Sequence, residues 1–233
     1  MSKSILEEQK AYYSARAREY DEWWNREGRY DRGDQHRAQW LSEADIIRQL
    51  LKRLQQQGTY QNVLEMACGT GIWTQNLALY FDKVHAVDAS PEMLAINRHK
   101  LALPNVTYQQ ADLFEWNPDQ TYDLVFFGFW LSHVPPERLP DFLQTVASAL
   151  RSGGRVVMLD SQRDPQTIAI DHQLPEDTQA QTLTRKLNDG QEYTIYKIFY
   201  QPADLIEAFT AAGFECEAAN TRQFFVYANA LKP

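Results

Sequence analysis

Short apolar runs alternate with amphipathic segments through the middle of the chain. Five of these runs predict strands, at 61–67, 83–88, 105–109, 122–128 and 154–160. Between them, apolar positions at helical spacing predict helices at 73–81, 91–102 and 136–150. Such alternation is typical of parallel strands joined by helical crossovers, in which ligands bind at the carboxyl ends of the strands.

The flanks of this region follow other patterns. Residues 4–27 and 36–57 predict two helices, the first rich in tyrosine and tryptophan. After Asp160 the alternation stops, and a polar stretch leads to a predicted β-hairpin around Asn188-Asp-Gly190. A last helix is expected at 202–212, followed by strands at about 214–219 and 222–229. Because only a few residues separate these two strands, they must pair antiparallel.

Length and charge narrow the classes of protein. The chain has 233 residues, with 23 Lys+Arg against 31 Asp+Glu, and one compact domain is the default at this length. A net charge of -8 argues against nucleic acid or an anionic membrane as partner. Only Cys68 and Cys216 are present, a usage that favours a reducing compartment. No apolar run approaches the ~20 residues of a membrane span, so we expect a cytoplasmic protein. Its oligomeric state is left open between a monomer and a homodimer.

The segment Val63-Leu-Glu-Met-Ala-Cys-Gly-Thr-Gly71 carries the clearest chemistry. Gly69 and Gly71 end a strand in a turn that a ligand can approach closely. Asp88 ends the next strand, 17 positions after Gly71, where a carboxylate can accept hydrogen bonds from ribose hydroxyls. The third glycine of the dinucleotide fingerprint is missing, since Ile72-Trp-Thr74 follows instead. The pattern therefore favours a nucleoside ligand without a pyrophosphate.

The motif Glu65-Met-Ala-Cys-Gly-Thr-Gly71, with Asp88 and then Ala111-Asp112-Leu113, resembles the class I methyltransferases that use S-adenosylmethionine (SAM). The resemblance covers roughly residues 60–160. It implies an enzyme that transfers a methyl group from SAM and releases S-adenosylhomocysteine (SAH). It also implies an α/β fold, a three-layer Rossmann-like sandwich whose mostly parallel seven-stranded sheet has an antiparallel last strand.

In these terms the whole chain, 1–233, is a single methyltransferase domain of four parts. A helical lid at 1–34 precedes a cofactor-binding core at 36–160. A substrate-side insertion at 161–200 contains the hairpin, and residues 201–233 supply the last helix and the antiparallel strands.

The resemblance also assigns residues to the cofactor. Glu65 would lie near the ammonium of the methionine portion or orient the loop, and Thr74 would bind its carboxylate or cap a helix. Asp88 would bind the ribose, a role favoured over capping the next helix because Ser90 is better placed for that. Asp112 would accept a hydrogen bond from the adenine amino group, unless it is a solvated loop carboxylate. The other expected contacts are Tyr13, Tyr20, Ala67, Gly69, Gly71, Ala89, Met93, Leu113, Phe127 and Gly128.

The acceptor is expected between the lid, the 129–133 loop and the insertion. His133 is a candidate general base, or else a structural hydrogen-bonding group beside Pro135. Tyr13 is a second catalytic candidate, since aromatic rings of a lid can stabilise a sulfonium. Trp24, Trp130 and Tyr196, with His133, are the expected substrate contacts. Arg16, Arg18 and Arg37 could hold an anionic group, although a solvated helix face is the favoured interpretation.

We therefore expect in-line methyl transfer to an O, N or C atom of a small organic acceptor with an apolar or ring-bearing body. Asp160 ends the fifth strand, where some metal-dependent O-methyltransferases keep a metal ligand. The Asp-Asn pair that accompanies this ligand in those enzymes is missing here, so no metal is expected. Two alternatives remain. A protein could bind SAM or SAH without turnover, or a nicotinamide oxidoreductase could use the same cradle, which the missing third glycine disfavours.

Overall fold

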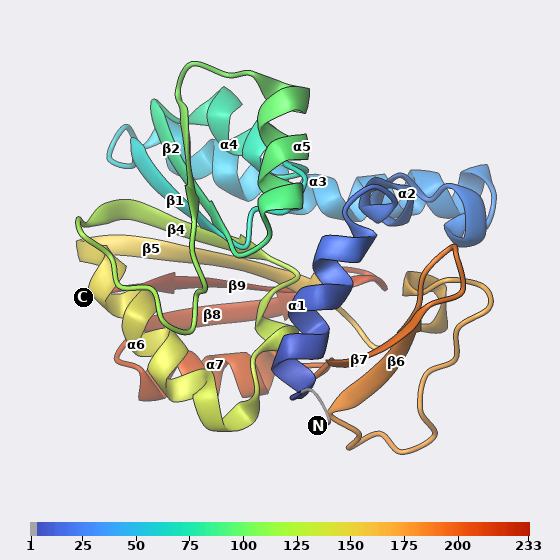
Figure 1. Cartoon of the computed structure of the whole chain (residues 1–233). Coiled ribbons are helices and arrows are strands. Elements are labelled where there is room, and N and C mark those ends of the chain that lie inside the picture. Colours follow the sequence, from blue (N-terminus) through green and yellow to red (C-terminus); the bar gives the residue numbers. More distant parts are fainter. Residues whose placement is uncertain (1–3) are drawn as a thin grey trace.

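The computed structural model describes residues 4–233 (Figure 1). Its centre is a seven-stranded sheet of order β3-β2-β1-β4-β5-β9-β8, in which β1 to β5 pair in parallel. Strand β9 runs antiparallel to both of its neighbours, as the sequence predicts. The strands are β1 (Asn62–Met66), β2 (Lys83–Asp88), β3 (Val106–Gln110), β4 (Tyr122–Gly128), β5 (Leu150–Ser161), β8 (Glu215–Asn220) and β9 (Phe225–Leu231).

Helices cover both faces of this sheet. One face carries α3 (Asp34–Gln56), α4 (Thr74–Tyr80) and α5 (Pro91–Leu101), and the other carries α6 (Leu139–Ala149) and α7 (Pro202–Ala211). Alternate side chains of β4 enter opposite layers, so that Phe126 packs with the first set and Phe127 with the second. Both are fully buried. A strand buried on both faces needs apolar residues at every position, which is why the core strands are continuous apolar runs in the sequence.

The amino-terminal lid consists of α1 (Ile5–Arg16), α2 (Tyr20–Asn25) and the short helix η1 (Gly28–Tyr30). Ser4 caps α1 by accepting a hydrogen bond from the Glu7 amide, while the Glu7 carboxylate accepts one from the Ser4 amide. The expected single helix at 4–27 is interrupted, because the Glu19 amide closes a tight turn onto the Arg16 carbonyl. This turn allows the Arg16 guanidinium to stack on the Tyr20 ring, 4.9 Å from its centroid.

The predicted hairpin is present as β6 (Thr182–Lys186) and β7 (Glu192–Tyr196), and α1 lies beside it (Figure 1). Gln9 of α1 joins three segments. Its side-chain oxygen accepts a hydrogen bond from the Tyr196 amide at 3.0 Å, and its side-chain nitrogen donates to the His133 carbonyl at 3.1 Å. The lid, the insertion and the loop after β4 are therefore fixed to one another at the carboxyl edge of the sheet.

Short 3-10 turns complete the described chain, as η2 (Leu131–His133), η3 (Pro136–Arg138) and η4 (Pro165–Thr167). Strand β5 begins at Leu150 rather than at the expected residue 154, and α6 begins three residues later than expected, after η3. Within residues 4–233 no helix combines the length and the apolar character that crossing a bilayer requires.

Candidate active site

Strained backbone marks the carboxyl ends of the two central strands. Ala67, just after β1, has φ 53°, and Phe129, just after β4, has φ 58°. L-residues other than glycine rarely adopt positive φ, and each such residue costs of order 1–3 kcal/mol. Because β1 and β4 are neighbours in the sheet, the two strained turns lie on either side of one opening. Gly69, with φ 52°, continues the turn after β1.

A cavity of about 830 Å³, here called the cofactor cavity, occupies this opening. Its walls come from the lid, from the turns after β1 and β2, and from the loops after β3 and β4. Ten of the expected cofactor contacts line it: Tyr13, Tyr20, Ala67, Gly69, Asp88, Ala89, Met93, Asp112, Leu113 and Gly128. Leu6, Gln9, Lys10, Ser14, Ser90, Phe114, Phe129, Trp130 and His133 complete its lining.

Asp88 connects the turns that follow β1 and β2. One carboxylate oxygen accepts a hydrogen bond from the Gly69 amide at 2.9 Å, and the other accepts from the Ser90 amide at 2.8 Å. Burial raises the pKa of Asp88, although these backbone hydrogen bonds act in the opposite direction. Ser90 caps α5 through a hydrogen bond from the Met93 amide, as expected. The Asp88 carboxylate is thereby held at the cavity wall with unused lone pairs.

Glu65 faces a narrow extension of about 290 Å³, which shares Tyr20, Ala67, Gly69, Gly128 and Phe129 with the cofactor cavity. The side chain is 2% exposed, and among the described residues its Oε2 atom has no hydrogen-bond partner. Loss of hydration raises the pKa of Glu65 to about 8. A buried carboxyl with an unused oxygen is suited to receive a cationic group such as an ammonium, which would restore its ionised form.

Three expected cofactor contacts lie outside these cavities. A Cβ atom on Gly71 would approach Asn97 Oδ1 to 2.5 Å, so this glycine permits close packing of α5. Thr74 is fully buried and accepts a hydrogen bond from Asn97. Phe127 packs against Phe142 on the opposite face of the sheet from the cavity turn. All three residues pack behind the cavity walls and do not line them.

The lid is connected to the core by ion pairs at the rim of the cofactor cavity. Lys10 of α1 pairs with Asp112, the residue expected beside the adenine. Asp21 of α2 accepts hydrogen bonds from the Thr70 hydroxyl and, at 2.8 Å, from Lys100 of α5. Both pairs are partly exposed and contribute about 0–1 kcal/mol each. These ion pairs therefore add little to the attachment of the lid, which rests mainly on buried aromatic side chains such as Trp23 and Trp24.

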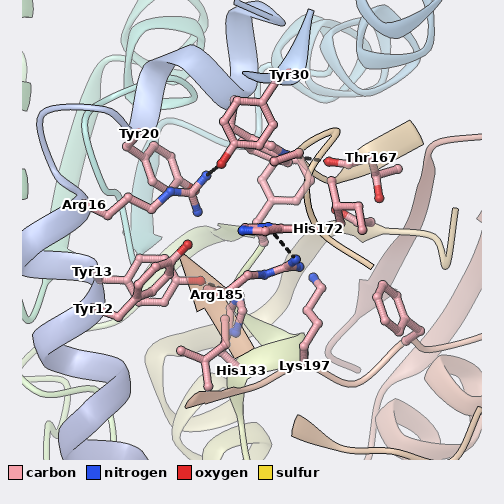
Figure 2. A pocket seen from close by; sticks show the side chains of 17 residues that line it. Tyr12, Tyr13, Arg16, Tyr20, Tyr30, His133, Thr167, His172, Arg185 and Lys197 are labelled. Carbon is pink, nitrogen blue, oxygen red and sulfur yellow. Dashed lines mark hydrogen bonds between the residues drawn. The ribbon is translucent and has the colours of Figure 1, made fainter. Parts of the chain in front are cut away.

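A second cavity of about 550 Å³, here called the acceptor cavity, adjoins the cofactor cavity at Tyr13 and Tyr20. Figure 2 shows the side chains that line it. It is bounded by the lid and by the 161–200 insertion. Tyr13, Tyr20, Phe129 and His133 line both cavities. Its remaining walls are Tyr12, Arg16, Trp23, Tyr30, Ser161, Thr167, Ile168, Ala169, His172, Arg185, Ile195, Lys197 and Phe199.

His133 is held from both sides of its ring. The Nδ1 atom lies 2.6 Å from the Tyr196 carbonyl, and the Nε2 atom lies 2.6 Å from the Tyr13 hydroxyl. Because a carbonyl only accepts, Nδ1 carries the proton, and Nε2 accepts the Tyr13 O–H. Burial and the nearby Lys197 charge lower the pKa of His133 to about 3. The imidazole is therefore neutral at physiological pH.

The structure redistributes the expected substrate contacts. Trp24 is buried in an aromatic cluster with Trp40, Trp73 and Phe225, and Trp23 lines the acceptor cavity in its place. Trp130 lines the cofactor cavity. Tyr196 contributes its backbone carbonyl to His133, while its ring lines neither cavity.

Sequence reasoning missed most of the positive charges of the acceptor cavity, and offered Arg16 as an anion-binding residue only as the less favoured alternative. Arg16, expected on a solvated face, is 9% exposed and lines the cavity. Arg185 and Lys197 enter from the 161–200 insertion, for which the sequence analysis named only Tyr196 as a substrate contact. The one available signal was alternation in the hairpin, which puts Leu183, Arg185 and Leu187 on one face; Leu183 and Leu187 are buried, and Arg185 is partly buried.

Comparisons with known proteins agree with this geometry. The family model described as a methyltransferase domain matches residues 63–154. Ubiquinone biosynthesis O-methyltransferase of Xanthomonas euvesicatoria pv. vesicatoria (strain 85-10) is 28% identical over 159 residues, which are 66% of this chain and 63% of that protein. The chain thus spans less than two thirds of the length of this curated relative.

Solved structures extend the likeness over the whole chain. The structure of a DhpI–SAH complex is 35% identical, with a TM-score of 0.75, and the match covers 100% of this chain and 98% of that one. A DhpI–SAM–HEP complex matches with 35% identity and a TM-score of 0.76, covering 99% of each chain.

The sheet is Rossmann-like with one reversed strand, Asp88 is the last residue of β2, and a cavity large enough for a nucleoside lies at the strand ends. Together these features define a SAM-binding α/β protein. With these matches, the chain belongs to the class I SAM-dependent methyltransferases. It is an enzyme that uses SAM as methyl donor and forms SAH. The matches lend no support to the alternatives of a binding protein without turnover or a nicotinamide oxidoreductase.

Proposed function

We propose that this methyltransferase acts on a small organic molecule bound in the acceptor cavity. The observation that carries the proposal is the set of four residues, Tyr13, Tyr20, Phe129 and His133, that line both cavities. A methyl group presented at their junction would face the acceptor cavity. Because the acceptor cavity is smaller than the cofactor cavity, an acceptor smaller than SAM fits it best.

In the proposed cofactor site, Asp88 binds the ribose hydroxyls, and Asp112 with Leu113 lies beside the adenine. Glu65 receives the ammonium of the methionine portion. The fit is supported by the unpartnered Oε2 atom of Glu65 and by the two backbone hydrogen bonds that orient Asp88. The bound cofactor supplies an electrophilic methyl group on a positively charged sulfur with a neutral leaving group.

Transfer is an in-line displacement. The bond between sulfur and the methyl carbon breaks, the sulfur keeps the electron pair, and a new bond forms to the acceptor atom. Two cavities that meet at one junction allow the acceptor atom and the sulfur to lie on opposite sides of the carbon. The chain's main contribution is positioning, which can supply roughly 7–11 kcal/mol.

Tyr13 is the proposed catalytic residue at this junction, and His133 is the residue proposed to position it. The neutral imidazole accepts the Tyr13 O–H at Nε2, which fixes the hydroxyl oxygen at the boundary between the two cavities. The oxygen keeps a lone pair for an acceptor group or for the electropositive methyl. With its pKa at about 3, His133 is a weak base, and its proposed role is to orient Tyr13.

The proposal is tested with SAM and a panel of small molecules, nucleic acids and proteins, following formation of SAH. Methylation of at least one small molecule, abolished by blocking the acceptor cavity with Ala169→Trp, is the expected result. Ala169 is fully buried and lines only the acceptor cavity, so SAH binding should persist in this variant. Methylation of protein or nucleic acid alone would refute the proposal.

A solved structure of a relative supports a reaction site made of two cavities. A DhpI structure is a complex with both SAM and HEP, so that protein holds a second molecule together with the cofactor.

A further inference from the structure

The acceptor cavity is basic in spite of the acidic composition of the chain. Arg16, His172, Arg185 and Lys197 line it, and within residues 4–233 no aspartate or glutamate does (Figure 2). The net charge of -8 therefore says nothing about this interior. The acidic residues lie elsewhere, and the question is which of the four basic side chains have their charge compensated.

Lys197 is compensated within the protein. Its ammonium lies 2.9 Å from the Asp160 carboxylate and 2.8 Å from the Ser132 hydroxyl, and both acid and lysine are nearly fully buried. His172 is neutral, because burial and the charges of Arg185 and Arg29 lower its pKa to about 4. These two residues account for no excess charge.

Arg16 has only neutral partners among the described residues. Its guanidinium donates to the Tyr30 hydroxyl at 3.3 Å and lies over the rings of Tyr12, Tyr20 and Tyr30, at 4.9 to 5.9 Å from their centroids. Hydroxyl and ring contacts stabilise a cation without neutralising it. The side chain is 9% exposed, so water compensates little of the charge.

Arg185 enters from β6 on the hairpin side of the cavity (Figure 2). Its one hydrogen bond within residues 4–233 is to His172, at 3.4 Å. Burial lowers the pKa of Arg185, and the positive charge of Arg16 lowers it further. The two guanidinium groups are thus close enough to repel each other, and neither has an ion-pair partner in the described chain.

Keeping two unpaired cations beside one cavity is costly unless a ligand supplies the missing negative charge. Guanidinium groups match planar or tetrahedral oxyanions through charge-assisted, often bidentate hydrogen bonds. We propose that the methyl acceptor is a small acid whose compact oxyanion, a carboxylate or a phosphoryl group, binds at Arg16 and Arg185. This inference rests on the proposed function and specifies its substrate class.

The charge of the cavity also bears on which atom is methylated. Methylation of an amine would leave a positive charge beside the two guanidinium groups. An ionised oxygen instead loses its negative charge as the sulfonium loses its positive charge, and no proton has to be removed. Such a step needs no strong base, in agreement with the weakly basic His133. The surrounding rings would give the acceptor's carbon skeleton an apolar environment, as the sequence suggested.

The first experiment measures binding directly. Protein saturated with SAH is titrated calorimetrically with acetate, with methylphosphonate, and with the uncharged acetamide. Saturable binding of one or both anions, with acetamide at least 30-fold weaker, is expected, and the stronger anion distinguishes a carboxylate from a phosphoryl ligand. Equal affinity for acetamide, or no anion binding to SAH-loaded protein, would overturn the inference.

The second experiment assigns the site. In Arg185→Gln and Arg16→Gln, anion affinity should fall at least tenfold, while SAH affinity changes less than threefold in Arg185→Gln. Arg18→Gln is the matched control, because Arg18 is exposed on the segment after α1 and lines neither cavity. Because Arg16 could also support the lid, thermal melting is recorded, and Arg16→Lys should recover part of the affinity. Unchanged anion binding in Arg185→Gln would contradict the assignment.

Turnover separates this inference from the proposed function. Acids should be methylated with a kcat/KM at least 100-fold above that of their amides or neutral esters. If neutral small molecules are methylated equally well, the oxyanion site is wrong and the proposed function stands. If the protein binds SAH but methylates only macromolecules, the proposed function itself fails.

Discussion

The Tyr13 hydroxyl of the lid donates a hydrogen bond to His133 Nε2 of the loop after β4, at 2.6 Å. This contact joins residues 120 positions apart, and both residues line the two cavities. The Tyr196 carbonyl accepts a hydrogen bond from the other side of the imidazole. The lid and the hairpin therefore both contact the His133 ring of the loop after β4. These contacts therefore join the three segments that bound the proposed reaction site.

Removal of the Tyr13 hydroxyl should reduce turnover more than cofactor binding. In Tyr13→Phe we expect a fall in kcat/KM of about 10–100-fold, within the range of a lost positioning or proton-transfer group. The affinity for SAH, measured by calorimetry, should change less than threefold. The control is Tyr193→Phe, whose hydroxyl contacts Gln191 at the exposed surface of the hairpin. Equal activity of both variants would remove Tyr13 from the reaction site.

The pH dependence of activity distinguishes the two roles of His133. Its pKa lies at about 3, so the imidazole stays neutral from pH 5 to 8 and should produce no inflection in the kcat profile there. The unfolded chain, in contrast, takes up a proton near pH 6.5. Stability should therefore fall as pH decreases from about 6.5 towards 3, by up to about 1.4 kcal/mol per unit, and His133→Gln should flatten this dependence. A kcat inflection near pH 6.5 that disappears in His133→Gln would instead identify a conventional base.

Asp88→Ala should weaken cofactor binding at least tenfold, equivalent to about 1.4 kcal/mol. The variant removes the proposed ribose ligand and also releases the Gly69 and Ser90 amides. Titration of SAH into each variant by calorimetry provides the measurement. Asp82→Ala, an exposed acid before β2, serves as control and should bind normally. Unaltered affinity in Asp88→Ala would exclude this carboxylate from the cofactor site.

The raised pKa of Glu65 predicts that the stability of the protein changes with pH in the opposite direction to the change expected from His133. The folded protein holds the Glu65 proton up to about pH 8, whereas the unfolded chain releases it near 4.3. Stability without cofactor should therefore decrease as pH rises through this window, and Glu65→Gln should lessen the slope. At pH 7, SAH binding should release protons, detected by calorimetry in buffers of different ionisation enthalpy. Proton release that persists unchanged in Glu65→Gln would contradict the assignment.

Gly71→Ala should destabilise the protein more than a conformationally similar substitution does. Gly71 has φ 93°, and its added Cβ would lie 2.5 Å from Asn97 Oδ1. Gly58 has φ 69° with no atom within 4 Å of such a Cβ, so Gly58→Ala measures the backbone cost alone. Thermal melting should show the larger loss at position 71. Similar losses at both positions would mean that Asn97 yields without cost.

Much of the fold follows from the sequence because strands buried on both faces require apolar runs, as in β4. The acid Asp88 was equally predictable, since it closes such a run at a fixed distance from the glycine turn. Which aromatic residues line a cavity and which are buried in the core could not be predicted from the sequence. Trp23 and Trp24 are adjacent on α2, yet one lines the acceptor cavity and the other packs against Trp73.

The basic lining of the acceptor cavity could not be predicted from the sequence for a related reason. Arg16 lies on an amino-terminal helix with many charges, and local pattern cannot tell a solvated arginine from one covered by a distant hairpin. The structure encloses Arg16 between the lid residues Tyr20 and Tyr30 and a cavity whose opposite wall includes Arg185 of the hairpin. The positive φ of Ala67 and Phe129 was equally hidden, because neither residue type favours that conformation.

The most direct test of the account is an experimental structure of the protein with SAH. We predict that the sulfur lies at the junction of the two cavities, between Tyr13, Tyr20, Phe129 and His133, and faces the acceptor cavity. The ribose should lie at Asp88. A sulfur that points away from this junction, or an SAH molecule bound elsewhere, would contradict the account.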